Sequence, residues 1–98
     1  MLNKCQVHIS FITELELLGY KSISSSERVV LKSFISACSI VDINNEIKEK
    51  SVRIRQKHRL KLPDSIIAAS ALYLDIPFIS ADKDFSKVKE LNLVLYEK

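Results

Sequence analysis

Short apolar runs of strand length alternate along this chain with longer segments whose apolar residues recur at helical spacing. Strands separated by helices imply right-handed crossovers, so this alternation predicts a mostly parallel sheet covered by helices on both faces. Only one Gly and two Pro occur in 98 residues, which leaves few positions for the tight turns of an all-β fold. The pattern therefore predicts the α/β class.

The expected elements follow from apolar spacing and from helix-capping side chains. Four segments read as strands: residues 7–10, 40–43, 77–80 and 93–96. Five segments read as helices: residues 11–18, 24–38, 44–57, 64–74 and 84–91. The fourth helix is almost entirely apolar or small, so we expect it to be buried on most sides.

Composition and charge exclude several classes of protein. The 15 Lys and Arg exceed the 12 Asp and Glu, and the formal charge of +3 permits contact with nucleic acid without requiring it. No apolar run approaches the roughly 18 residues of a membrane-spanning helix, and residues 1–6 are too short and polar for a signal peptide. Cys5 and Cys38 fit neither a zinc site nor a disulfide framework, so we expect a cytoplasmic protein with no membrane partner.

Acidic residues are expected at one edge of the sheet, where the carboxyl ends of parallel strands meet the N-termini of the following helices. Glu16 follows the first strand, Asp64 begins the buried helix, and Asp82 comes directly after the third strand. Asp84 lies two residues further on. Carboxylate oxygens from separate segments are the ligands that Mg²⁺ or Mn²⁺ requires. Such a site predicts metal-assisted cleavage of a phosphodiester bond.

Each acid also has a structural interpretation that the sequence leaves open. Residues 13–16 fit a capping box, and the helical wheel does not distinguish Glu14 from Glu16. The helix dipole favours an acid such as Asp64 in a first turn, whatever the function. Asp82 fits an ordinary N-cap.

Three segments resemble the later motifs of PIN-domain proteins, particularly VapC-type toxins. They are residues 10–19 (SFITELELLG), 62–71 (LPDSIIAASA) and 80–85 (SADKDF). The resemblance implies a three-layer α/β/α sandwich with a parallel sheet. It also implies Mg²⁺-dependent endoribonuclease cleavage of RNA, held in check by an antitoxin.

The resemblance further implies a set of catalytic, metal-binding carboxylates: Glu16, Asp64 and Asp82. Asp84 is implied as a further metal ligand or as an acid that supports the others. Ser10 and Ser80 are candidate supporting residues that orient the carboxylates or metal-bound water, or that simply cap helices.

The match is that of a single PIN-like domain over residues 1–98, truncated at its N-terminus. The family pattern begins with a strand that ends in an Asp, followed by a helix, and residues 1–6 do not match it. Loss of one anionic ligand predicts weaker metal binding and impaired catalysis. Three hypotheses explain the departure: a gene start assigned too far downstream, a gene remnant, or a piece completed by another chain.

Two functions from different classes follow. The first is a toxin ribonuclease that acts on RNA, pairs with an antitoxin and forms a homodimer. The second is a non-catalytic PIN-like module that binds an antitoxin or another PIN subunit. The basic residues within 53–61 are interpreted as a solvated helix face, because no aromatic residues interleave with them for base stacking.

Overall fold

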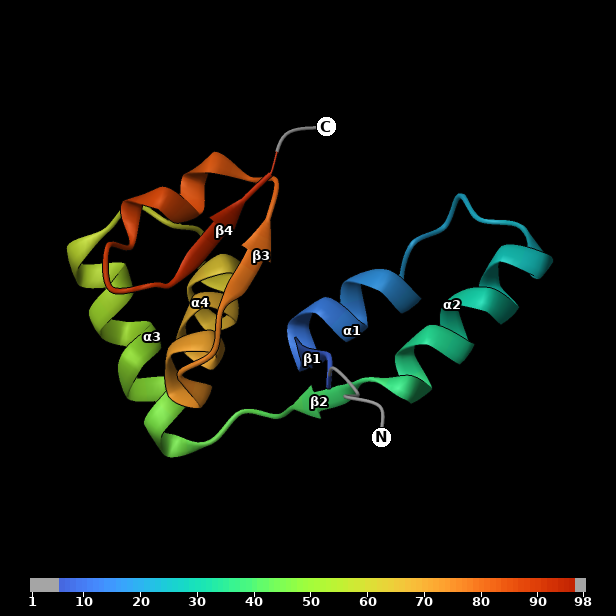
Figure 1. The fold of residues 1–98 in the computed structure, drawn as a ribbon, viewed down its shortest axis with the longest axis horizontal. Coiled ribbons are helices and arrows are strands. Elements are labelled where there is room, and N and C mark those ends of the chain that lie inside the picture. The colour runs from blue at the N-terminus through green and yellow to red at the C-terminus, as the bar shows by residue number, and fades with distance from the viewer. Residues whose placement is uncertain (1–5, 97–98) are drawn as a thin grey trace, which may run out of the picture. The chain divides into compact units, whose positions relative to one another are not determined.

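The computed structural model describes residues 6–96, in which helices and short strands alternate (Figure 1). The chain divides into two compact units, Met1–Asp42 and Ile43–Lys98. Each unit has its own pair of parallel strands, so the predicted α/β class and parallel pairing are confirmed. None of the helices within residues 6–96 has the length and apolar character needed to cross a membrane.

The first unit begins with β1 (His8–Ser10), which runs directly into α1 (Phe11–Leu18). A loop leads to α2 (Ser25–Ala37), and β2 (Ser39–Val41) follows after one residue. β1 and β2 pair in parallel along their whole length. The predicted bounds of α1 are confirmed, whereas β2 begins one residue earlier than expected and ends two residues earlier.

Two side chains hold the loop between α1 and α2. The Ser24 hydroxyl accepts a hydrogen bond from the backbone N–H of Glu27 at 3.1 Å. The Glu27 carboxylate accepts one from the backbone N–H of Ser24 at 2.8 Å, which completes a capping box. These bonds lower the pKa of Glu27 because they favour its charged form. The Arg28 guanidinium donates to the carbonyls of Leu18 and Tyr20, which ties the end of α1 to the start of α2.

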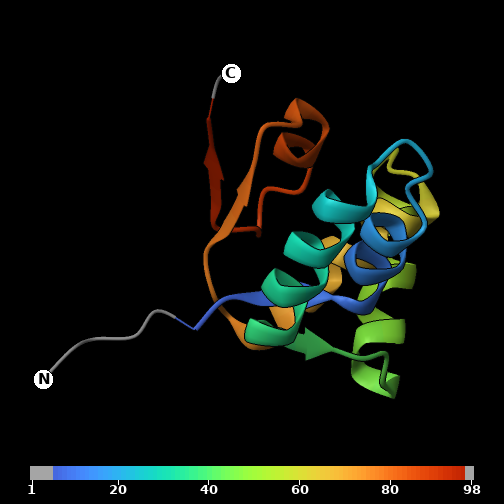
Figure 2. The same ribbon diagram turned by 90° about the vertical axis from the view of Figure 1, so that its right-hand side faces the viewer.

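The second unit contains α3 (Asn45–Lys57) and α4 (Leu62–Leu74), joined by a short connection. It continues through β3 (Phe78–Ser80) and the 3₁₀ helix η1 (Lys83–Lys87) to β4 (Leu93–Leu95). Figure 2 shows β3 and β4 side by side, and they pair in parallel along their whole length. The carboxyl ends of β3 and β4 therefore meet at one edge.

Close packing of α3 against α4 makes the core of the second unit. Apolar side chains of both helices are buried there: Ile47, Ile54, Ala68, Ala69 and Ala71. Three buried serines satisfy their hydroxyls by donating to the carbonyl four residues earlier: Ser51, Ser65 and Ser70. Small side chains let two helix backbones approach closely, so the position of α4 relative to α3 is well fixed.

The last predicted helix is wrong in its extent and type. The sequence predicts a helix over residues 84–91, whereas η1 covers Lys83–Lys87 and is a 3₁₀ helix. Apolar residues spaced three apart are buried in this segment: Phe85, Val88 and Leu91. A repeat of three residues matches the 3₁₀ helix, which has three residues per turn, better than it matches an α-helix.

Candidate active site

Asp64 lies in the first turn of α4, where it is half-buried. Unpaired backbone N–H groups at a helix N-terminus favour a negative charge there, and Pro63 is suited to the same turn. Burial nevertheless raises the pKa of Asp64, the charges of Asp82 and Asp84 raise it further, and Lys61 opposes them. The carboxylates of Asp82 and Asp84 therefore lie within electrostatic range of Asp64.

Ser80 and Asp82 order the turn that carries two of these acids. The Ser80 hydroxyl accepts a hydrogen bond from the backbone N–H of Asp82 at 3.0 Å. One carboxylate oxygen of Asp82 accepts from the backbone N–H of Asp84 at 2.9 Å, and this bond caps η1. Asp84 pairs with Lys87 at 3.7 Å. The N-cap interpretation of Asp82 is thus confirmed.

The capping-box interpretation of Glu16 is wrong. The N-cap of α1 is Ser10, whose hydroxyl accepts from the backbone N–H of Ile12 at 3.1 Å, and Thr13 lies inside the helix. Glu16 is exposed on α1 in the first unit. The metal-ligand role of Glu16 stays a prediction.

The chemistry of the acid group fits a hard divalent cation. A partly buried carboxylate that is repelled by two others gains from a bound positive charge, and carboxylate oxygens are the ligands that Mg²⁺ prefers. Within residues 6–96 no three His, Cys, Asp or Glu side chains stand close enough to hold one ion together. The group thus has the donor type of a magnesium site, but its side chains are spaced more widely than in a formed one.

Sequence reasoning missed Tyr96 as a neighbour of this group. The backbone N–H of Tyr96 donates to the carbonyl of Ser80 at 3.1 Å, directly beyond the last residue of β4. Ser80 therefore contacts Tyr96 through its carbonyl and Asp82 through its hydroxyl. The available signal was the position of Tyr96 at the carboxyl end of a predicted strand, the same kind of position that identified Asp82.

His58 does not take part in the acid group. Its Nε2 atom lies 3.7 Å from a carboxylate oxygen of Glu90, and Lys57 lies 3.8 Å from the other oxygen. Among the buried side-chain atoms of residues 6–96, His58 Nε2 has no hydrogen-bond partner within bonding distance. This arrangement joins the end of α3 to the segment before β4 and gives His58 no contact with a reacting group.

Comparison with known proteins identifies the family. The model of the PIN domain matches residues 2–91, so the chain belongs to the PIN domain family. A toxin-antitoxin complex from Klebsiella pneumoniae has a similar structure, with a TM-score of 0.79 and 33% sequence identity; the match covers 95% of this chain and 77% of that one. No curated protein matches the chain.

Two further solved structures share the fold at lower identity. One is VapBC2 from Rickettsia felis bound to a DNA fragment from their promoter, with a TM-score of 0.80, 18% identity, and coverage of 94% of this chain and 76% of that one. The other is VapBC-1 from nontypeable Haemophilus influenzae, with a TM-score of 0.78, 20% identity, and coverage of 97% and 78%. The resemblance to PIN-domain proteins and the fold class predicted from the sequence are both confirmed.

Proposed function

We propose that this PIN-domain chain is a VapC-type toxin: an endoribonuclease that cleaves RNA with Mg²⁺ or Mn²⁺ and is inhibited by an antitoxin. The observation that carries the proposal is that Asp82 and Asp84 follow the carboxyl end of β3 and act electrostatically on Asp64 at the start of α4. Membership of the PIN family and the likeness to a toxin-antitoxin complex support it.

The proposed metal ligands are Asp64 and Asp82, with Asp84 in the same turn as Asp82. The resemblance to PIN-domain proteins adds Glu16 to the proposed set. A bound Mg²⁺ would supply an activated water and neutralise charge on the phosphate. The chain's own residues position the oxygens: Ser80 orients the turn of Asp82, and the N-terminus of α4 holds Asp64.

Cleavage of a labelled single-stranded RNA by the purified chain, in Mg²⁺ and in EDTA, tests the proposal. Asp64→Asn should lower Mg²⁺-dependent cleavage by roughly 100-fold or more, the scale on which preorganised charge acts in active sites. Asp75→Asn is the matched control, because Asp75 lies at the opposite end of α4 in the left-handed conformation that Asn tolerates. Equal loss in both variants, or none in Asp64→Asn, refutes the assignment.

A non-catalytic interaction module is the second candidate, and a groove on the second unit favours it. The groove of about 590 Å³ is lined by apolar side chains including Ile43, Val52, Leu62 and Ile66. Such a module would bind an antitoxin or a second copy of the chain as a homodimer. Calorimetric titration with Mg²⁺ separates the candidates: heat that Asp64→Asn abolishes supports the enzyme, and a stable dimer or antitoxin complex without such heat supports the module.

A further inference from the structure

Tyr96 lies next to Ser80, the residue whose hydroxyl holds the acidic turn. Its backbone is fixed by the hydrogen bond to the Ser80 carbonyl, yet the residue is 50% exposed. Burying an aromatic ring lowers the free energy, so a half-exposed ring held in place is suited to stack with a planar partner. Every nucleobase offers such a face. Ser80 therefore links Tyr96, through backbone hydrogen bonding, to the turn that carries Asp82.

Cationic side chains from two segments flank the same acids. Lys87 donates to the backbone carbonyl of Arg59 at 3.2 Å and lies 3.7 Å from Asp84, which places the connection between α3 and α4 against η1. Lys83 stands between Asp82 and Asp84 in the chain, and Lys61 acts on the charge of Asp64. The sequence alone does not reveal that the connection between α3 and α4 lies against η1.

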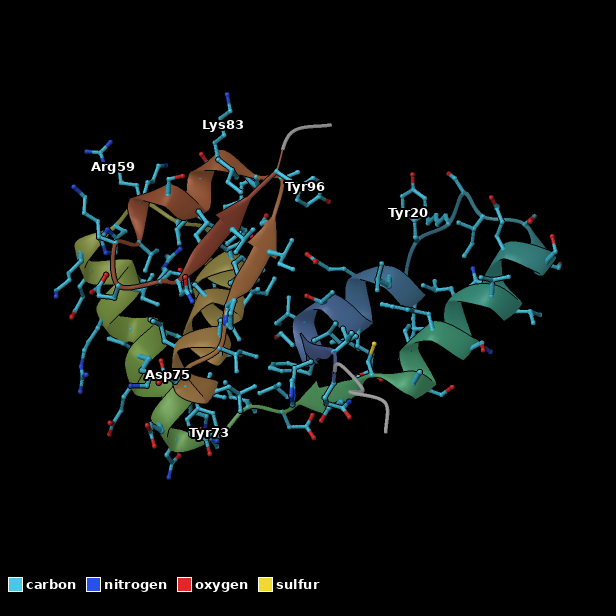
Figure 3. The ribbon with its side chains drawn as sticks, viewed as in Figure 1. Tyr20, Arg59, Tyr73, Asp75, Lys83 and Tyr96 are labelled. Carbon is cyan, nitrogen blue, oxygen red and sulfur yellow. The ribbon has the colours of Figure 1, made fainter. Side chains whose placement is uncertain are left out.

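Three of these cations are available to a ligand. Arg59, Lys61 and Lys83 are exposed, and none of them forms an ion pair with a carboxylate within residues 6–96. Figure 3 shows Arg59, Lys83 and Tyr96 at the end of the second unit where β3 and β4 finish, and Tyr73 and Asp75 at the other end. Positive side chains that lie near carboxylates without pairing to them remain free to contact phosphates.

We propose that single-stranded RNA binds across this edge, with its phosphates against Arg59, Lys61 and Lys83 and one base stacked on Tyr96. The inference rests on the proposed function and assigns base stacking to Tyr96 and phosphate contacts to the three cations, because an unpaired base can turn its face to a protein ring. It also answers the sequence argument against RNA contact: the aromatic residue missing among residues 53–61 is supplied by the end of β4.

The stacking contact is tested by RNA binding in EDTA, where metal-dependent cleavage is absent. The probes are a short fluorescein-labelled RNA of mixed sequence and an abasic ribose-phosphate chain of the same length. Tyr96→Ala should weaken RNA binding by about five- to tenfold, at the low end of the effect of a stacked base, and leave abasic-chain binding unchanged. Tyr96→Phe, which keeps the aromatic ring, should restore RNA binding to the level of the parent. Tyr73→Ala is the matched control, since Tyr73 is a partly exposed tyrosine on α4.

The phosphate contacts are tested by the salt dependence of the same binding. Each contact with a single strand contributes about 0.7 to the slope of log K against log salt concentration, so R59A/K83A should lower that slope by about 1.4. The loss should be the same for RNA and for the abasic chain. The control is K48A/R53A, which removes the same charges from exposed positions inside α3.

The outcomes distinguish this inference from the proposed nuclease activity. The contrast between RNA and abasic chain in Tyr96→Ala, together with the lower slope in R59A/K83A, supports the inference whether or not Mg²⁺ causes cleavage. Absence of either effect, equal loss in the control variants, or tighter binding of duplex than of single-stranded RNA overturns it. Cleavage that persists alongside such a result leaves the proposed function intact.

Discussion

Replacing Asp64 by Asn should stabilise the fold while removing a proposed metal ligand. The raised pKa of Asp64 means that its charged form is disfavoured in the folded chain, by burial first and then by Asp82 and Asp84. Asp82 and Asp84 repel the charge of Asp64 and Lys61 attracts it, so one repulsive interaction remains uncompensated. At a partly exposed site one such interaction is worth roughly 0.2–1 kcal/mol. A chain of this length shifts its melting temperature by about 4–8 °C per kcal/mol, so we expect Asp64→Asn to raise it by about 1–8 °C at neutral pH.

The pH dependence of folding stability tests whether the charge of Asp64 destabilises the folded chain. A carboxyl whose pKa is higher in the folded state binds its proton more tightly there, so stability falls as pH rises from the ordinary value of 3.8 through the raised one. Above that window the charged Asp64 is a constant cost, which Asn does not carry. The stability difference between Asp64→Asn and the parent should therefore shrink as pH falls through the same window.

Thermal unfolding followed by circular dichroism, at several pH values and with or without Mg²⁺, measures these effects. Saturating Mg²⁺ should reverse the order, because a ligand at 100 times its Kd stabilises the parent by about 2.7 kcal/mol and Asp64→Asn binds it weakly. Asp75→Asn keeps every proposed ligand, so Mg²⁺ should stabilise it by the same amount as the parent. A lower stability of Asp64→Asn than of the parent in EDTA at neutral pH would contradict the repulsion at Asp64. Equal stabilisation of Asp64→Asn and the parent by Mg²⁺ would contradict the metal-ligand role.

Three further substitutions test the fold. Ser24→Ala removes the capping hydroxyl of α2 and should cost about 1 kcal/mol, seen as a lower melting temperature; an unchanged value contradicts the capping box. Ile47→Ala empties a position with 0% exposure and should cost about 2–5 kcal/mol in urea unfolding, whereas Val52→Ala on the exposed side of α3 should cost about 0.5 kcal/mol or less. Arg28→Ala should speed amide hydrogen exchange between α1 and α2, and equal rates would show that its two hydrogen bonds do not hold the loop.

Local rules predicted most of the elements within one or two residues. The start of α3 followed from Asn44, whose side chain accepts from the N–H of Ile47 at 2.8 Å, and α4 begins at Leu62, two residues before Asp64. The 84–91 helix failed because a spacing of three fits a 3₁₀ turn as well as one face of a short α-helix. Apolar spacing over so few residues does not separate the two.

The candidate site was predictable where topology alone determines position. Asp64 and Asp82 were expected together because helix starts and strand ends share one edge of a parallel sheet. Tyr96 was not expected there because its place depends on the register of β3 with β4, which pairs Ser80 with Leu95. Register follows from tertiary packing, so no residue near Tyr96 in the chain indicates it.

Ser80 couples the end of β4 to the acidic turn through two hydrogen bonds. Its carbonyl is held by the residue after β4, and its hydroxyl holds the backbone of Asp82. A protein that pulled on the end of β4, or added a strand beside it, would shift the carboxylate through a single intervening residue. Binding at the end of β4 would therefore move Asp82 without touching it.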